Sequence, residues 1–220
     1  MPDLNHIKYL TINKKDIKEP ILIIGSKEYD FDKFNFLNEF KKLGYEDITG
    51  IDIQSGSGVD FVLDVCNTKD IFFNKYEEYF NTVICMQTLY AVSNPFDAAE
   101  NISKIMNDKA ILFFSDVFIH KIHRIPQDYW RFSYDAHKVL FKTLVFDDKK
   151  VKISITRYNK LSNLEYPFPE FLKYHKNKGE SSLAFLVRKI NRKLFSVGLL
   201  SISRLLPELS IFSIAYKKNE

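Results

Sequence analysis

The chain has 220 residues, of which 45% are hydrophobic and 27% are charged, and its formal net charge at pH 7 is +4. This length suits one α/β domain with an insertion, and the composition is ordinary for a globular protein that buries a sizeable core. The mild positive charge is compatible with a phosphorylated substrate or an acidic surface, but it does not require a nucleic-acid partner.

Neither a membrane span nor a disulfide is expected. The N-terminus lacks the long apolar region of a signal peptide. The apolar stretch near the C-terminus is interrupted by basic residues, namely Arg188, Lys189, Arg192, Lys193 and Arg204. Cys66 and Cys85 both lie in apolar runs, which favours buried free thiols. The sequence therefore predicts a cytoplasmic protein.

The first part of the chain alternates strands and helices. Residues 1–19 are polar and predict an N-terminal helix or strap, whereas 20–26 are apolar and β-branched, which is typical of a buried parallel strand. Apolar residues spaced three apart then predict an amphipathic helix that ends before Gly44, namely Phe31, Phe34, Leu37, Phe40 and Leu43. Two further strands are predicted at 47–53 and 60–65.

The same alternation continues toward the C-terminus. A helix at 69–79 precedes a strand at 82–87. Asn94 and Pro95 then begin a helix, as its cap and its first turn. The apolar stripe of that helix consists of Ala98, Ala99, Ile102, Ile105 and Met106. The remaining predicted elements are a strand at 110–117, a helix at 134–144, and strands at 151–158 and 210–218.

Residues 160–208 separate the last two predicted strands. Their helical pattern puts basic residues opposite an apolar face, which consists of Leu183, Leu186, Val187, Ile190, Leu194 and Val197. We interpret 160–208 as a helical insertion, and 1–220 as a single domain. The whole pattern predicts a doubly wound, mostly parallel, seven-stranded Rossmann-like sheet.

The residues that follow each strand form the candidate site, because ligands of open α/β sheets bind beyond the carboxyl ends of the strands. Asp52 could accept hydrogen bonds from both hydroxyls of a ribose, or it could cap a turn. Asp64 could accept from an adenine amino group or cap a turn. The segment GSKEYD, which begins at Gly25, lacks the glycine-rich pyrophosphate fingerprint. This argues against NAD or FAD and favours a nucleoside ligand without phosphates.

The segment HRIPQDYWRF, residues 123–132, concentrates polar and aromatic side chains after the fifth strand. His120 or His123 could take a proton from a substrate hydroxyl, since imidazole titrates near neutral pH. Arg124 or Arg131 could hold a phosphate or a carboxylate with two parallel hydrogen bonds.

The other side chains of this segment allow functional and structural interpretations. Tyr129 and Trp130 could exclude water from the site or stack on a sugar ring. Trp130 and Phe132 could equally anchor the loop to the core. Asp128 could orient a histidine, pair with Arg131 or cap a turn.

Four segments together resemble the class I S-adenosylmethionine-dependent methyltransferases: ILIIGSKEYD, GIDIQSGSGVDFVLDV, NTVICMQTLYAVSNPFDAAENI and HRIPQDYWRF. The resemblance covers about 20–145. Within this class, the sequence most resembles a type 11-like bacterial branch, which has Gly-Ser after strand one and H-x-x-P-x-D-Y-W-R-F after strand five. It implies that the last strand is antiparallel and lies between strands five and six.

The resemblance also implies roles for residues of the site. S-adenosylmethionine would be the cofactor and S-adenosylhomocysteine the product, with no metal ion. Gly25 and Ser26 would contact the methionine and ribose parts, and Asp52 would hold the ribose hydroxyls. The adenine would lie near Asp64 and Val65. Ile53 would also contact the cofactor, and Gln87 would form the floor near the sulfonium.

This chain departs from the family pattern at three places. Ile23 replaces an acidic residue, and Leu89-Tyr90-Ala91 replaces Leu-Glu-His. Asn107-Asp108-Lys109 replaces Pro-Gly-Gly before strand five. The lost Glu-His pair removes a candidate base at that position.

The resemblance implies methylation of a small-molecule acceptor, in particular a hydroxyl of an activated or carrier-linked sugar in surface-glycan synthesis. His123 would be the base, and the helical insertion at 160–208 would cap the acceptor site. The basic residues of the insertion could contact a membrane surface, although a solvated helix face also explains them. One alternative is a methyltransferase-like subunit that has lost catalysis and binds a partner.

A nucleic-acid methyltransferase is a further alternative. Asn94-Pro95-Phe96 resembles the Asn-Pro-Pro-Tyr signature of that group, but it lacks the second proline and is a good helix start. No concentrated basic segment is present, so no nucleic-acid partner is expected.

Overall fold

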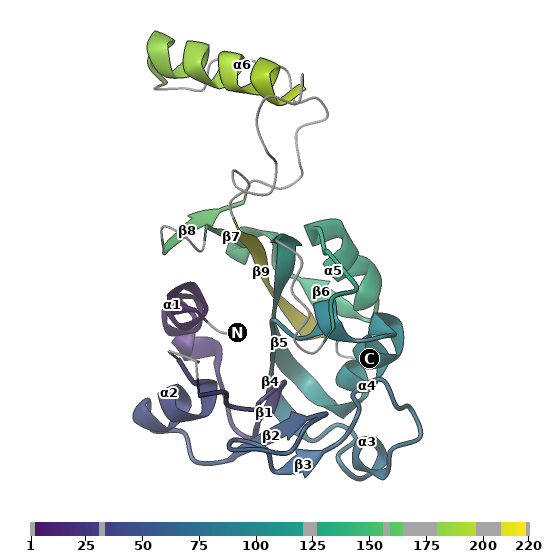
Figure 1. Ribbon diagram of the computed structural model, residues 1–220. Helices are drawn as coiled ribbons and strands as arrows, with labels where there is room; N and C mark the ends of the chain where they lie inside the picture. The colour runs from purple at the N-terminus through teal and green to yellow at the C-terminus, as the bar shows by residue number, and fades with distance from the viewer. Residues whose placement is uncertain are drawn as a thin grey trace.

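A computed structural model describes residues 3–30, 34–120, 127–155, 159–164, 180–196 and 208–218. Within these ranges, nine strands form one sheet with helices on both faces (Figure 1). The strands are β1 (Ile21–Ile24), β2 (Ile48–Asp52), β3 (Phe61–Val62), β4 (Phe80–Met86), β5 (Met106–Ile119), β6 (Leu144–Phe146), β7 (Lys152–Ile155), β8 (Lys160–Asn163) and β9 (Leu209–Lys217).

Six α-helices and three short 3-10 helices lie within the described ranges. The α-helices are α1 (Leu4–Ile12), α2 (Phe36–Lys42), α3 (Ile71–Lys75), α4 (Pro95–Ile105), α5 (Tyr134–Leu140) and α6 (Ser182–Ser196). The 3-10 helices are η1 (Lys14–Asp16), η2 (Leu89–Ala91) and η3 (Asp148–Lys150).

The sheet has the strand order β3-β2-β1-β4-β5-β9-β7-β8, and β6 pairs with β9. The first five strands are parallel to one another, whereas β9 runs antiparallel to both β5 and β7. This confirms the implied antiparallel last strand and its place between the fifth and sixth predicted strands. The chain moves outward from β1 to β3 and returns to β4, so the order of strands reverses between β1 and β4. That reversal creates a crevice at the carboxyl ends of the strands.

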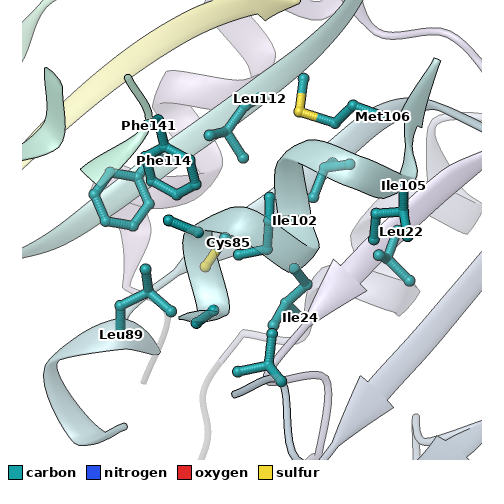
Figure 2. Close-up of a cluster of buried hydrophobic side chains, with 14 of the residues drawn as sticks. Leu22, Ile24, Cys85, Leu89, Ile102, Ile105, Met106, Leu112, Phe114 and Phe141 are labelled. Carbon is teal, nitrogen blue, oxygen red and sulfur yellow. The ribbon is translucent and has the colours of Figure 1, made fainter. Parts of the chain in front are cut away.

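Two apolar layers hold the helices on the sheet. Helices α3, α4 and α5 cover one face, and α1 and α2 cover the other (Figure 1). Figure 2 shows the first layer, where Ile102 and Ile105 of α4 lie among side chains of β1, β4 and β5. Four residues of the predicted stripe, Ala98, Ala99, Ile102 and Ile105, lie in α4 and are buried, whereas the fifth, Met106, is buried at the start of β5. Asn94 caps α4 by accepting from the backbone N–H groups of Phe96 and Asp97, with Pro95 in the first turn.

Several predicted boundaries are wrong. Among the described residues the sheet has nine strands where seven were predicted, because β6 and β8 were missed. The proposed insertion is not wholly helical, since 160–163 form β8, which pairs with β7. The predicted strand at 60–65 is reduced to the two residues of β3. Residues 107–109 lie inside β5, at an irregularity in its pairing with β4. Phe80 of β4 pairs with Met106, whereas Thr82, two residues later, pairs with Ile111.

Helix α6 lies apart from the sheet and its two helical layers (Figure 1). Its predicted apolar residues Leu183, Leu186, Val187 and Ile190 are all exposed. No helix in the described ranges has the length and apolar character that crossing a membrane requires. Whether 160–208 caps an acceptor site stays a prediction.

Candidate active site

A cavity of about 480 Å³ lies beyond the carboxyl ends of β1, β2 and β4. Its size is in the range of small-molecule binding sites. All seven residues predicted to bind a cofactor line this cavity, namely Gly25, Ser26, Asp52, Ile53, Asp64, Val65 and Gln87. The sheet topology has therefore brought these residues, which are dispersed in the sequence, to one place.

The turn after β1 packs closely against the end of β4, and its backbone forms part of the cavity wall. Gly25 has φ +73°, a conformation that favours glycine, and a Cβ added to it would lie 2.5 Å from Thr88 Oγ1. The backbone N–H groups of Gly25 and Ser26 both donate to the Ile51 carbonyl, at 2.9 and 3.1 Å. Thr88 Oγ1 in turn donates to the Ile24 carbonyl. The close packing of β1, β2 and the end of β4 thus explains why glycine stands at this turn.

The carboxylate of Asp52 is held at the end of β2 by two backbone groups. Its Oδ2 accepts from the Lys27 N–H at 3.1 Å, and its Oδ1 accepts from the Gln54 N–H at 2.9 Å. Asp52 therefore has the turn-capping contacts of the structural interpretation. An ionised carboxylate has about four acceptor positions, so two remain for ligand hydroxyls. Its role toward a ribose stays a prediction.

Asp64 and Val65 form the neighbouring wall after β3. The Asp64 Oδ1 accepts from the Cys66 N–H at 2.9 Å, and Val65 is buried. Ile53, at the far side of Asp52, is 59% exposed. An apolar surface beside a carboxylate suits the flat ring and the amino group of a nucleobase.

Gln87 connects the cavity floor to the C-terminal strand. It has φ +57°, its backbone N–H donates to the Ser115 carbonyl at 2.8 Å, and its Nε2 donates to Ser210 Oγ at 2.8 Å. The side chain is therefore fixed between β4, β5 and β9. A rigid floor at this point would position a ligand without further rearrangement.

Asp116 is a buried carboxyl that the sequence interpretation did not single out. It is fully buried in β5, where its Oδ2 accepts from the Tyr90 N–H and its Oδ1 from the Val117 N–H, both at 2.8 Å. Burial raises the pKa of Asp116 to about 7, against the lowering effect of these hydrogen bonds. Because Tyr90 and Ala91 line the cavity, Asp116 fixes one of its walls.

The pH dependence of stability tests this account of Asp116. The folded state binds more protons at this carboxyl than the unfolded state between about pH 4 and about pH 7. Asp116 should therefore lower the free energy of unfolding as pH rises through that window. Burial lowers the pKa values of His6 and His137. These two residues therefore raise the free energy of unfolding as pH rises toward about 6.5, which opposes the effect of Asp116.

A variant that cannot ionise separates these contributions. From pH 5 to pH 7, the free energy of unfolding of Asp116→Asn should rise relative to the wild type by about 1–3 kcal/mol. Denaturant unfolding at several pH values measures the difference. Parallel curves for the two proteins would show that Asp116 does not titrate in this range.

The Tyr129 to Phe132 part of the aromatic loop is anchored to the core. The backbone N–H groups of Tyr129 and Trp130 donate to the Tyr90 carbonyl, and that of Phe132 donates to the Val117 carbonyl. The Trp130 indole N–H donates to the Val92 carbonyl at 2.9 Å, and its ring stacks on the buried Phe132. These contacts support the structural interpretation of Trp130 and Phe132.

Asp128 and Arg131 form a two-point ion pair. The Arg131 guanidinium also donates to the carbonyls of Trp130 and His120. Asp128 thus makes the arginine contact that was one of its three interpretations. Its carboxylate raises the pKa of Arg131. A substrate anion would have to compete with Asp128 for Arg131.

The predicted substrate residues are not all at the cavity. Tyr129 lines it, together with Gln127, whereas His120, Trp130 and Arg131 are absent from its described lining. His120 Nε2 instead lies 3.8 Å from a carboxylate oxygen of Glu208. His123 and Arg124 lie outside the described residues.

Sequence reasoning missed an aromatic part of the cavity wall. It consists of Tyr29, Phe34 and Phe36, which precede or begin α2, and it is joined by Tyr90 of η2. A cluster of aromatic residues between the first strand and its helix was the available signal. Ile23, which replaces an acidic residue of the family, is buried in the apolar layer under α1 and α2.

Comparisons with known proteins agree with this geometry. The model of a family described as "Methyltransferase domain" matches residues 32–144, which is more than half of the chain. A search of curated proteins gave no match.

Solved structures share the fold at low sequence identity. A SAM-dependent methyltransferase from Archaeoglobus fulgidus is 16% identical, with a TM-score of 0.53 over 96% of this chain and 92% of that chain. The YcgJ protein from Bacillus subtilis is 10% identical, with a TM-score of 0.54 over 98% and 99% of the two chains.

A third similar structure was solved with a cofactor product. It is a phosphoethanolamine N-methyltransferase from Haemonchus contortus in complex with phosphomonomethylethanolamine and S-adenosylhomocysteine. It is 13% identical, with a TM-score of 0.53 over 96% of this chain and 53% of that chain.

The sheet order and the cavity at its switch point define a Rossmann-like α/β protein with a pocket for a small molecule. The family match makes the assignment narrower: this chain belongs to the methyltransferase domain family and is a class I S-adenosylmethionine-dependent methyltransferase.

The residues of the cavity fit this cofactor. Gly25 and Ser26 bring a turn of the backbone into the cavity wall, where a ligand can approach the main chain closely. Asp52, Asp64 and Glu28 give the cavity carboxylates, which suit a ligand with a positively charged sulfur. No cluster of three or more metal-ligating side chains occurs in the part of the chain that the structure describes.

Proposed function

We propose that this protein transfers a methyl group from S-adenosylmethionine to a hydroxyl of a small-molecule acceptor. The observation that carries the proposal is a single cavity lined both by the seven predicted cofactor residues and by Gln127 and Tyr129 of the HRIPQDYWRF segment. The segment that follows β5 therefore reaches the site where a cofactor would bind.

The roles of individual residues are part of this proposal. Gly25 and Ser26 contact the methionine and ribose parts of the cofactor, and Asp52 accepts hydrogen bonds from the ribose hydroxyls. Asp64 accepts from the adenine amino group, with Val65 and Ile53 against the ring. The orientations of Asp52 and Asp64 support these roles, because backbone N–H groups fix both carboxylates beside the cavity.

When bound, the cofactor supplies a methyl carbon that its sulfonium already activates for in-line displacement. The protein then has to align the acceptor, exclude water and remove one proton. We assign proton removal to His123, because the segment that contains it connects β5 to Gln127 at the cavity. Tyr129, which is 54% exposed, offers an aromatic surface for the acceptor.

We further propose a sugar acceptor that carries a nucleotide or a lipid-type carrier, in surface-glycan synthesis in the cytoplasm. The resemblance to the branch with the HRIPQDYWRF segment supports this class. A stacking surface such as Tyr129 suits a sugar ring, and the net charge of +4 suits a phosphorylated group.

A transfer assay tests the proposed function. The purified chain is incubated with methyl-labelled S-adenosylmethionine and a panel of nucleotide-activated sugars and small amines, and the label should appear as an O-methyl ether in one of the sugars. Label on nitrogen would contradict the hydroxyl assignment. Cofactor binding without transfer to any tested acceptor, sugar or amine, would favour the degenerate binding subunit.

A further inference from the structure

The described part of α6 exposes an apolar stripe along its length. Leu183 is 71% exposed, and Leu186, Val187 and Ile190 are 52%, 48% and 49% exposed. These positions are i, i+3, i+4 and i+7, so they lie on one side of the helix. Single exposed apolar residues are common, but four on one helix side mark an interaction surface.

The charge of this segment has one sign. Residues 181–207 contain five Lys or Arg residues and no Asp or Glu. Arg188 and Lys189 lie between Val187 and Ile190 in the chain, and at 100° per residue they lie on the side of the helix away from the stripe. Arg188 Nη2 forms an ion pair with Oε2 of Glu180, which precedes the helix, at 2.9 Å. The Arg188 guanidinium lies 5.4 Å from the centre of the Phe185 ring.

From these observations we infer that α6 binds in the surface of an anionic lipid membrane, parallel to the bilayer plane. The apolar stripe would enter the boundary of the acyl chains, and the basic side chains would contact lipid phosphates. Fifteen residues give a helix about 22 Å long, which is short for a span and suits an in-plane position.

Other occupants fit the helix less well. A second copy of α6 would bring like charges together without any acidic residue on the helix to neutralise them. A nucleic acid would contact the basic side but would leave the apolar stripe in water. An anionic bilayer satisfies both sides at once. The inference concerns localisation at a surface, so it goes beyond the proposed methyl transfer and does not depend on it.

Vesicle sedimentation with the full chain tests the inference. The protein should bind vesicles of phosphatidylcholine and phosphatidylglycerol at least about tenfold more tightly than vesicles of phosphatidylcholine alone, and added salt should weaken the binding. The double variant Leu186→Glu/Ile190→Glu should lose at least about tenfold of this affinity, since it puts charge into the stripe.

A matched control makes the same type of change elsewhere. The variant Ile71→Glu/Val139→Glu alters two exposed apolar residues of α3 and α5, which are 79% and 62% exposed, and should bind vesicles like the wild type. Absence of binding to anionic vesicles would overturn the inference, as would equal binding by the stripe variant. Self-association that only the stripe variant loses, without vesicle binding, would assign the stripe to a second copy instead. Affinity for S-adenosylmethionine, measured in parallel, reports separately on the methyltransferase site.

Discussion

Replacement of His123 by alanine should lower turnover by about 10²–10⁴-fold while the affinity for S-adenosylmethionine stays unchanged. A hydroxyl acceptor has to lose its proton during or after attack, and an imidazole has a suitable pKa for accepting it. The structure narrows the choice between the two candidate histidines, because His120 faces Glu208 and is absent from the described cavity lining.

The pH profile distinguishes a base from a structural residue. In the wild type, kcat should rise with pH through the histidine range, and His123→Ala should lack that rise. Added imidazole should restore part of the activity of this variant. A loss of thermal stability with kcat unchanged would instead make His123 a structural residue.

Asp52→Ala should weaken binding of S-adenosylmethionine by about 1–3 kcal/mol, the usual cost of losing hydrogen bonds to a charged group. The loss follows from the position of the carboxylate, which lines the cavity and has acceptor capacity beyond its contacts to Lys27 and Gln54. Isothermal calorimetry measures the affinity directly.

Asp52 also supports the loop, so a matched variant is needed. The Asp60 carboxylate accepts from the N–H of Gly50, which lies in β2 with Asp52, at 2.7 Å. Asp60 does not line the cavity, so Asp60→Ala removes a similar contact outside the site. This control should lose stability and keep its cofactor affinity. Equal affinity of Asp52→Ala and the wild type would show that Asp52 only caps the turn.

The central part of the fold could be predicted because β1, β2 and β4 are short, largely apolar runs that end at or just before Gly25, Asp52 and Gln87. Gly25, Asp52 and Gln87 were identified as site residues from their positions after three such strands, and the topology then places them in one cavity. The place of β9 came from the family resemblance, because nothing local in a strand specifies a distant antiparallel partner.

Features that depend on tertiary packing were not predictable. Strand β6 has three residues and forms by pairing with β9, which follows much later in the chain. The burial of Asp116 depends on the way η2 packs against β5, and no local sequence pattern around Asp116 signals a carboxyl with a raised pKa. The sequence predicted the apolar side of α6 but not its exposure, because periodicity shows that a helix has an apolar side and does not show what covers that side.

Calorimetric titration of the purified chain with S-adenosylmethionine and S-adenosylhomocysteine tests the central claim most directly. We expect micromolar binding of both at a single site, because the cavity beyond β1, β2 and β4 presents a close backbone turn and oriented carboxylates. If neither ligand binds to protein that circular dichroism shows to be folded, this result would contradict a cofactor site in this cavity.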